Sequence, residues 1–277
     1  MKFIACAIIF LISSVANAGV VLTVGNSPSG LFSDRLAQYG HTVTIGPHYD
    51  AFDGSIDLSQ YDAIVFSAVS YAYPDMPLLG QQSIVDFVTH GGGLITGEWT
   101  TWRNNATGAF GTIAPILPAS TDGSYIGGAG VEVSVRYTQV ISDPILNAGL
   151  PASMDFIVNS AGSEIINPKA GSTVFYSGDS ISPYYLFENN GWVPYDGVFP
   201  SAGLVGWQYG AGRVLTFSTT MQQPIGPDYT DNYSRLVANS IDWVSRPHAV
   251  PEPASLTVFG LGALCLMGAA TRRRNAA

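Results

Sequence analysis

The sequence predicts an α/β fold with a mainly parallel sheet and a second half that is richer in β-strands. Three observations lead to this prediction. Short apolar runs alternate with helical segments over residues 19–100, as in buried parallel strands joined by crossover helices. Residues 131–141 alternate apolar and polar side chains, which is typical of an antiparallel strand. Two further apolar runs flank Gly210-Ala211-Gly212, a hairpin signal.

The first half is expected to contain four strands and two helices. The first helix, Ser29 to Tyr39, has apolar residues at near-helical spacing and ends before Gly40, a suitable C-cap. The second helix, Gln81 to His90, is stopped by the glycine run at 91–93. The strands are expected at residues 19–25, 41–46, 63–68 and 94–99.

The second half is expected to end in a hairpin and a helix. Strands are predicted at 131–141, 173–178, 204–210 and 212–219, and a helix at 233–244. Trp243 lies off the apolar stripe of that helix, so we expect it to cover a neighbouring loop.

Composition excludes one class of partner. The chain has 11 Lys plus Arg against 20 Asp plus Glu, for a net charge of −9. A nucleic-acid-binding protein needs a basic face to neutralise phosphates, so that function is not expected. The two cysteines, Cys6 and Cys265, lie in the apolar ends, and residues 19–250 have none. The part between the ends therefore has no disulfide, no thiolate metal site and no cysteine nucleophile.

The N-terminus is predicted to be a secretory signal peptide, residues 1–18. Lys2 supplies the positive start and Phe3 to Val15 the apolar run. Ala16 and Ala18 match the small-x-small cleavage pattern, which makes Gly19 the expected mature N-terminus. An uncleaved membrane anchor is the alternative, although the run is short for a span.

The C-terminus is predicted to be a membrane helix with a basic end. Residues 254–271 form an 18-residue run without a charge, just long enough to span if helical. Arg272, Arg273 and Arg274 follow, and arginine clusters stay on the cytoplasmic side, so residues 19–250 would lie outside that membrane. A simple tail anchor would have the same composition.

The order of motif, span and basic end resembles the PEP-CTERM sorting signal. Pro251, Glu252 and Pro253 precede the apolar run and would be the recognition motif, within a signal at residues 247–277. The resemblance implies a Gram-negative bacterium that makes extracellular polysaccharide. It also implies signal peptidase and exosortase as processing partners. The protein would be membrane-anchored transiently, and residues 19–246 would then remain at the cell surface or in the extracellular matrix.

The central part resembles the class I glutamine amidotransferase-like superfamily, and most closely its ThuA-like branch. Four segments carry the resemblance: GVVLTVGNSPSGLFSDRLAQYGHTVTI, LSQYDAIVFSA, IVDFVTHGGGLITG, and YGAGRVLTFSTT with NYSRLVANSIDWV. The segment SDPILNAGLP is also similar, with Asp143 standing where these domains often have a histidine. The resemblance implies a flavodoxin-like three-layer sandwich over residues 19–246.

Active members of that superfamily need a thiolate on a strained strand-to-helix elbow, activated by a histidine. By the resemblance the elbow follows the glycine run and contains Thr96, Gly97, Glu98, Trp99 and Thr100. No cysteine is present there, and no histidine occurs between His90 and His248. Glutaminase chemistry is therefore excluded if the fold is as expected, and no catalytic residue is assigned.

One group of residues is a candidate ligand site. Glu98, Trp99, Trp102 and Arg103 follow a predicted strand, at the edge where open α/β sheets bind ligands. Tryptophan faces suit sugar rings, and Glu and Arg side chains can hydrogen-bond hydroxyls. Alternatively, Glu98 pairs with Arg103 and the two tryptophans pack a loop.

Other polar groups have no motif that defines a site. Residues 26–30 lack the spacing of a dinucleotide or phosphate loop, and Ser67 and Ser70 are not in a G-x-S-x-G elbow. The remaining histidines and aspartates fit neither HExxH nor an EF-hand, so we expect solvated loop residues and neither a metal nor a cofactor: His41, His48, His90, Asp50, Asp53, Asp57, Asp228 and Asp231.

Two functions remain open. The first is a non-enzymatic surface or matrix protein that binds glycan, such as extracellular polysaccharide, or another envelope partner. The second is a ThuA-like enzyme that acts on carbohydrate with carboxylates. A concave pocket that joins Glu98 to another acid and an aromatic wall would favour the enzyme.

Overall fold

The computed structural model describes residues 19–25, 30–68, 74–97, 99–127, 133–158, 163–181, 184–188, 191–195, 197–219, 221 and 231–245. The chain divides into two compact units, Met1–Arg246 and Pro247–Ala277. The predicted signal peptide with its cleavage site, the Pro-Glu-Pro motif, the apolar run and the arginine cluster all lie outside the described residues. Within the part that is described, no helix is both long and apolar enough to span a membrane.

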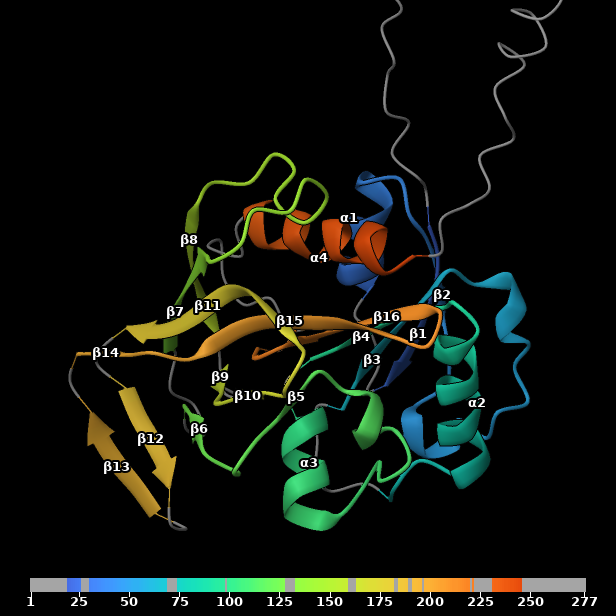
Figure 1. Ribbon diagram of the computed structural model, residues 1–277, viewed down its shortest axis with the longest axis horizontal. Helices are drawn as coiled ribbons and strands as arrows, with labels where there is room; N and C mark the ends of the chain where they lie inside the picture. The colour runs from blue at the N-terminus through green and yellow to red at the C-terminus, as the bar shows by residue number, and fades with distance from the viewer. Residues whose placement is uncertain are drawn as a thin grey trace, which may run out of the picture. The chain divides into compact units, whose positions relative to one another are not determined.

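A ten-stranded mixed sheet forms the centre of the first unit (Figure 1). Its first half is parallel, in the order β2-β1-β3-β4-β16. These strands are β1 (Val20–Gly25), β2 (Thr42–Ile45), β3 (Ala63–Ser67), β4 (Gly93–Thr96) and β16 (Gly212–Phe217). Strands β1, β3 and β4 are buried almost throughout. Their sequences are therefore continuous apolar runs and do not alternate apolar and polar residues.

The other half of the sheet is antiparallel and continues in the order β15-β11-β7-β8, with β14 paired to β11. The strands are β7 (Val133–Gln139), β8 (Ser153–Val158), β11 (Thr173–Ile181), β14 (Val198–Phe199) and β15 (Ala202–Tyr209). The predicted hairpin joins β15 to β16 through Gly210 and Ala211, and Gly210 adopts the positive φ of 58° that such a turn requires.

Helices cover both faces of the sheet (Figure 1). On one face α1 (Gly30–Gln38) and α4 (Asp231–Val244) contact each other and enclose a core that includes Leu36, Leu236 and Ile241. On the other face α2 (Leu78–Thr89) packs against β4 and β16 over a second core. The expected α/β architecture with a covered parallel sheet is therefore confirmed.

Short elements fill the connections. They comprise α3 (Thr100–Thr107), the 3-10 helices η1 (Tyr49–Ala51), η2 (Leu58–Gln60) and η3 (Ala114–Ile116), and two small sheets. The small sheets contain β5 (Ala119–Ser120) with β10 (Asn167–Pro168), and β6 (Tyr125–Ile126) with β9 (Ser163–Glu164), β12 (Tyr184–Glu188) and β13 (Gly191–Tyr195).

Several sequence expectations were wrong in detail. Asp231, expected in a solvated loop, is the first residue of α4. The strand predicted at 94–99 ends at Thr96, because the chain turns at Trp99 to start α3. Helix α2 begins at Leu78 rather than Gln81, since Pro77 occupies its N-cap. His41 is not a solvated loop residue: it is 4 % exposed and its Nδ1 accepts a hydrogen bond from the Gly19 backbone N–H. Burial lowers the pKa of His41, which favours the neutral ring.

Candidate functional site

The candidate site is built around the turn that joins β4 to α3. Trp99 is the N-cap of α3 and has φ 72° and ψ −17°, in the left-handed region. A residue with a Cβ pays about 1 kcal/mol or more to adopt this conformation. The elbow expected after the glycine run is therefore present as a strained turn, and its left-handed residue is a tryptophan.

An aromatic cluster surrounds this turn. Trp99 and Trp102 meet edge to face, with ring centroids 4.8 Å apart. Tyr125 of β6 contacts both rings, at 5.4 Å and 6.2 Å. The Trp102 indole N–H donates to the Gly123 carbonyl over 3.1 Å, which ties α3 to the β5–β6 connection. All three rings are half-buried, so each keeps some surface open to solvent.

Arg103 does not join this cluster. It is 3 % exposed, and its guanidinium bonds to the Tyr49 hydroxyl. It also stacks against the Tyr49 and Phe110 rings, 5.0 Å and 5.1 Å from their centroids. Of the four residues predicted as a ligand site, the structure thus brings Trp99 and Trp102 together and directs Arg103 into the core. Glu98 lies outside the described residues.

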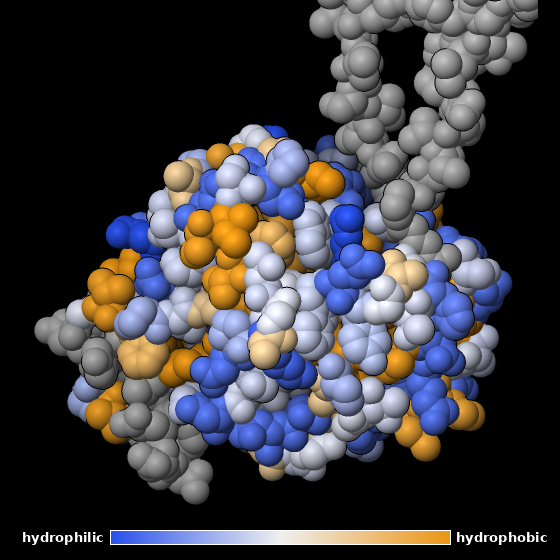
Figure 2. Space-filling model, in the orientation of Figure 1, coloured by the Kyte–Doolittle hydropathy of each residue, from blue (hydrophilic) through white to orange (hydrophobic). Residues whose placement is uncertain are grey.

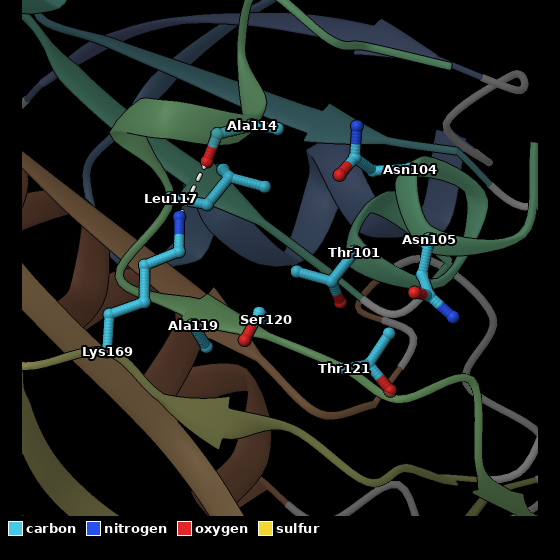
Figure 3. Close-up of a pocket in the computed structure, with 9 residues that line it drawn as sticks. All are labelled: Thr101, Asn104, Asn105, Ala114, Leu117, Ala119, Ser120, Thr121 and Lys169. Carbon is cyan, nitrogen blue, oxygen red and sulfur yellow. Dashed lines mark hydrogen bonds between the residues drawn. The ribbon is translucent and has the colours of Figure 1, made fainter. Parts of the chain in front are cut away.

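A polar pocket of about 150 Å³ lies beside the aromatic cluster (Figure 3). Helix α3 forms one wall and strand β5 with the following residues forms the other. Lys169 extends from beyond β10 toward η3, where its ammonium donates to the Ala114 carbonyl over 2.7 Å (Figure 3). The lining residues are Thr101, Asn104, Asn105, Ala114, Leu117, Ala119, Ser120, Thr121 and Lys169. Hydroxyls and amides therefore dominate the walls.

Glu164 lies directly behind this pocket. It belongs to β9 and is 1 % exposed. The Thr101 hydroxyl, which lines the pocket, donates to Glu164 Oε2, while Oε1 has no hydrogen bond of good geometry to any described residue. Burial raises the pKa of Glu164 to about 8, and the Thr101 and Thr121 hydroxyls oppose this rise. The carboxyl is therefore mostly protonated at neutral pH.

The charge in the pocket comes from Lys169. Its ammonium lies 5.7 Å from the centre of the Trp207 ring, and burial lowers its pKa. None of the nine lining residues is acidic. The pocket can thus donate hydrogen bonds to a polar ligand, but its walls hold no carboxylate for acid–base chemistry.

The described residues contain no group of three or more His, Cys, Asp or Glu side chains that could hold a metal ion. His48 contacts Asp50, with 2.5 Å between Nδ1 and Oδ1, and His90 bonds to the backbone of its own helix. Ser67 is buried at the end of β3, whereas Ser70, residues 26–29 and Asp228 lie outside the described residues.

The sequence did not predict the pocket or Glu164. Helix α3 was missed, and β5, β6, β9 and β10 are two-residue strands that leave no periodic pattern. The one usable signal was the isolated glutamate in Ser163-Glu164-Ile165-Ile166, a carboxyl flanked by apolar residues.

Comparison with known proteins gives a motif and a fold. Residues 249–274 match the PEP-CTERM protein-sorting motif, and no curated protein matches the chain. Solved structures match with low sequence identity, so they show the fold alone. One is the cytoplasmic protein STM3548 from Salmonella typhimurium, with a TM-score of 0.58 and 16% identity over 82% of this chain and 99% of that chain.

Two further solved structures have the same fold. The cytoplasmic protein STM1381 from Salmonella typhimurium LT2 has a TM-score of 0.56 and 14% identity over 82% of this chain and 100% of that chain. A ThuA-like protein from Parabacteroides merdae has a TM-score of 0.51 and 15% identity over 84% of this chain and 92% of that chain. The chain therefore combines an α/β unit with ThuA-like structural neighbours and a C-terminal PEP-CTERM sorting motif, which indicates an exported protein that an exosortase processes.

Proposed function

We propose that this chain is a surface or extracellular-matrix protein of a Gram-negative bacterium that binds a neutral glycan without cleaving it. Residues 1–18 would direct export and be removed, and residues 254–271 would anchor the chain in the membrane until processing. Residues 19–246 would form the flavodoxin-like binding domain of an amidotransferase-like scaffold. The observation that carries the proposal is the polar pocket beside the Trp99–Trp102–Tyr125 cluster.

The pocket has the chemistry that a sugar requires. Asn105 and Ser120 are exposed at its rim and can donate or accept hydrogen bonds. The Thr101 hydroxyl donates to Glu164, so toward a ligand it can only accept. Cavities of this size hold benzene, so about 150 Å³ accommodates roughly six heavy atoms, which is one edge of a sugar ring with its hydroxyls. The adjoining aromatic rings offer the flat apolar faces on which the C–H faces of a pyranose can pack.

Three observations support binding without catalysis. The left-handed elbow residue is Trp99, which has no nucleophilic atom. Residues 19–250 contain no cysteine. The described pocket walls contain no acid, and the buried Glu164 carboxyl is separated from the pocket by the Thr101 and Thr121 side chains. Glycoside hydrolysis needs two carboxyl groups on either side of the scissile bond, and the described walls offer none.

Binding can be tested with the full chain in a detergent whose headgroup is not a sugar. The sample is applied to an array of neutral and acidic oligosaccharides, and affinities for neutral hits are then measured by calorimetry. Asn105→Ala should weaken binding about tenfold. Asn167→Ala is the matched control, because Asn167 is an exposed asparagine in neighbouring β10 that does not line the pocket. Equal affinities for the two variants would contradict the proposed site.

A second candidate is a carbohydrate-active enzyme, and Glu164 is the observation that favours it. A carboxyl with its pKa raised to about 8 resembles a general acid, and the Thr101 and Thr121 side chains separate it from the pocket. Release of reducing ends from a polysaccharide panel, lost in Glu164→Gln and retained in Asn167→Ala, would establish this candidate and displace the first.

A further inference from the structure

A second groove lies on the α4 face of the sheet. It has a volume of about 410 Å³ and shares no lining residue with the pocket at α3. Strands β11, β15 and β16 form its floor, and Trp243 in the last turn of α4 forms a wall. At Gly206 a Cβ atom would lie 2.5 Å from Leu215 Cδ2, so the floor is kept free of a side chain there.

The groove contains a cation with no acidic partner among the described residues. Arg213 Nη1 donates to the Trp243 carbonyl over 2.8 Å, and the guanidinium stacks 5.0 Å from the centre of the Trp243 ring. These two contacts fix the plane of the guanidinium. The Arg136–Asp155 salt bridge and the His48–Asp50 contact, both in the described part of the chain, do not involve it. An oriented guanidinium without a carboxylate is prepared to receive one from a ligand.

The other walls suit a ring that bears hydroxyls. Phe175 and Trp243 meet at 70° with centroids 5.2 Å apart, which makes an aromatic corner. Gln208 is exposed at the rim and Thr173 is half-buried, so an amide and a hydroxyl face the same space. The groove thus places one cation, one aromatic corner and two neutral hydrogen-bonding groups around a single volume.

We propose that this groove binds the carboxylate-bearing sugar ring of an acidic polysaccharide. The carboxylate would pair with the Arg213 guanidinium, and the ring would pack against Phe175 and Trp243. The net charge of −9 disfavours contact with an acidic polymer, so the oriented Arg213 would supply the local attraction that such a contact needs. This site is independent of the neutral-glycan pocket.

The probe is trigalacturonate, titrated into the full chain in a detergent without a sugar headgroup. Maltotriose is the neutral comparison and inorganic phosphate the anionic one. We expect trigalacturonate to bind at least tenfold more tightly than either. Arg213→Gln should lower its affinity at least tenfold. Arg213→Lys should also weaken it, because an ammonium lacks the planar fork that matches a carboxylate. Equal binding of maltotriose or of phosphate would overturn the proposal.

Two further variants complete the test. Arg235→Gln is the matched control, since Arg235 stacks on Tyr39 away from the groove, and its affinity should equal that of the unchanged chain. If Arg213→Gln does not fold, Gln208→Ala replaces it as the test variant. Gln208 is exposed, so its side chain contributes little to packing. If Gln208→Ala lowers the affinity for trigalacturonate threefold or more, the result supports the site. An unchanged affinity overturns it. Asn105→Ala should leave trigalacturonate binding intact, which separates this site from the pocket at α3.

Discussion

The Thr101 hydroxyl donates a hydrogen bond to the buried Glu164 carboxyl, 2.5 Å away and 63 residues later in the chain. This contact joins the first turn of α3 to β9, and it lies at the boundary between the polar pocket and the core. Thr101 therefore contacts both the pocket and the buried carboxyl.

The first prediction concerns pH. The folded pKa of Glu164, about 8, lies above its usual value of 4.5, so the folded state binds more protons than the unfolded state between these values. Stability should therefore be unaffected by this group below pH 4.5, fall as the pH rises to 8, and stay level above it. The total effect is at most about 5 kcal/mol.

Glu164→Gln isolates this effect, because the amide imitates the protonated acid and does not titrate. Urea unfolding of both chains at pH 5 and pH 9 should show that the variant loses less unfolding free energy between these pH values than the unchanged chain does. Asp242 is present in both chains and shifts in the same direction, since burial raises its pKa to about 6, so only the difference between the chains is attributed to Glu164. Identical losses would mean that Glu164 is charged in the folded protein.

The second prediction concerns the strained elbow. At φ 72° alanine is penalised and glycine is not, so Trp99→Gly should be more stable than Trp99→Ala by about 0.5–1 kcal/mol. Both variants lose the same aromatic contacts, and each therefore serves as the other's control. Chemical unfolding measures the difference. If the alanine variant were the more stable, Trp99 would not be in the left-handed region.

The third prediction concerns the packing of α2. Gly80 lies inside this helix, where alanine normally stabilises by about 1 kcal/mol. A Cβ at Gly80 would lie 1.9 Å from the Phe52 carbonyl oxygen, so Gly80→Ala should destabilise by about 3 kcal/mol or more. Gly111→Ala is the control, since its nearest neighbour is 3.5 Å away, and it should change the unfolding free energy by less than about 0.5 kcal/mol. A neutral Gly80→Ala would contradict this close approach.

The centre of the parallel half of the sheet was predictable because β1, β3 and β4 are buried almost throughout and leave continuous apolar runs such as Val20–Gly25. The prediction that Trp243 covers a loop was also confirmed. Its indole N–H donates to Asp143 Oδ2 over 3.1 Å, in the loop after β7. Helix α3 was not predicted, because its sequence TTWRNNAT is polar and its only apolar anchor is one tryptophan.

The candidate site was predictable only in part. Trp99 and Trp102 are close in sequence, and one helical turn brings their rings together. Arg103, on the same helix, faces Tyr49, which lies 54 residues earlier. That contact, like the one between Thr101 and Glu164, depends on long-range packing, which local spacing does not encode.

The fourth prediction concerns the loop after β7. Asp143 accepts backbone hydrogen bonds from Ile145 and Leu146 through Oδ1 and holds the Trp243 indole through Oδ2. Asp143→Ala should therefore cost about 1–3 kcal/mol of unfolding free energy. The control Asp53→Ala removes an exposed aspartate that caps one local turn, and it should cost less than about 0.5 kcal/mol. Equal costs would show that Asp143 does not hold this loop.

The exposed apolar side chains do not gather around the pocket at α3. Leu78 and Leu79 lie on α2, and Val140, Ile141 and Ile145 follow β7. Figure 2 shows hydrophobic residues in separate patches among hydrophilic ones on the face in view. Recognition by polar groups in a pocket, as we propose at α3, agrees better with this surface than a broad apolar interface does.

Binding and cleavage can be measured together on one sample. A fluorescent neutral oligosaccharide that the array identifies is incubated with the full chain, and anisotropy and product length are recorded over the same hours. We expect saturable binding, weakened about tenfold by Asn105→Ala, with the oligosaccharide recovered at its original length. Shortened products that disappear in Glu164→Gln, or an affinity that Asn105→Ala leaves unchanged, would contradict a non-catalytic glycan-binding pocket at α3.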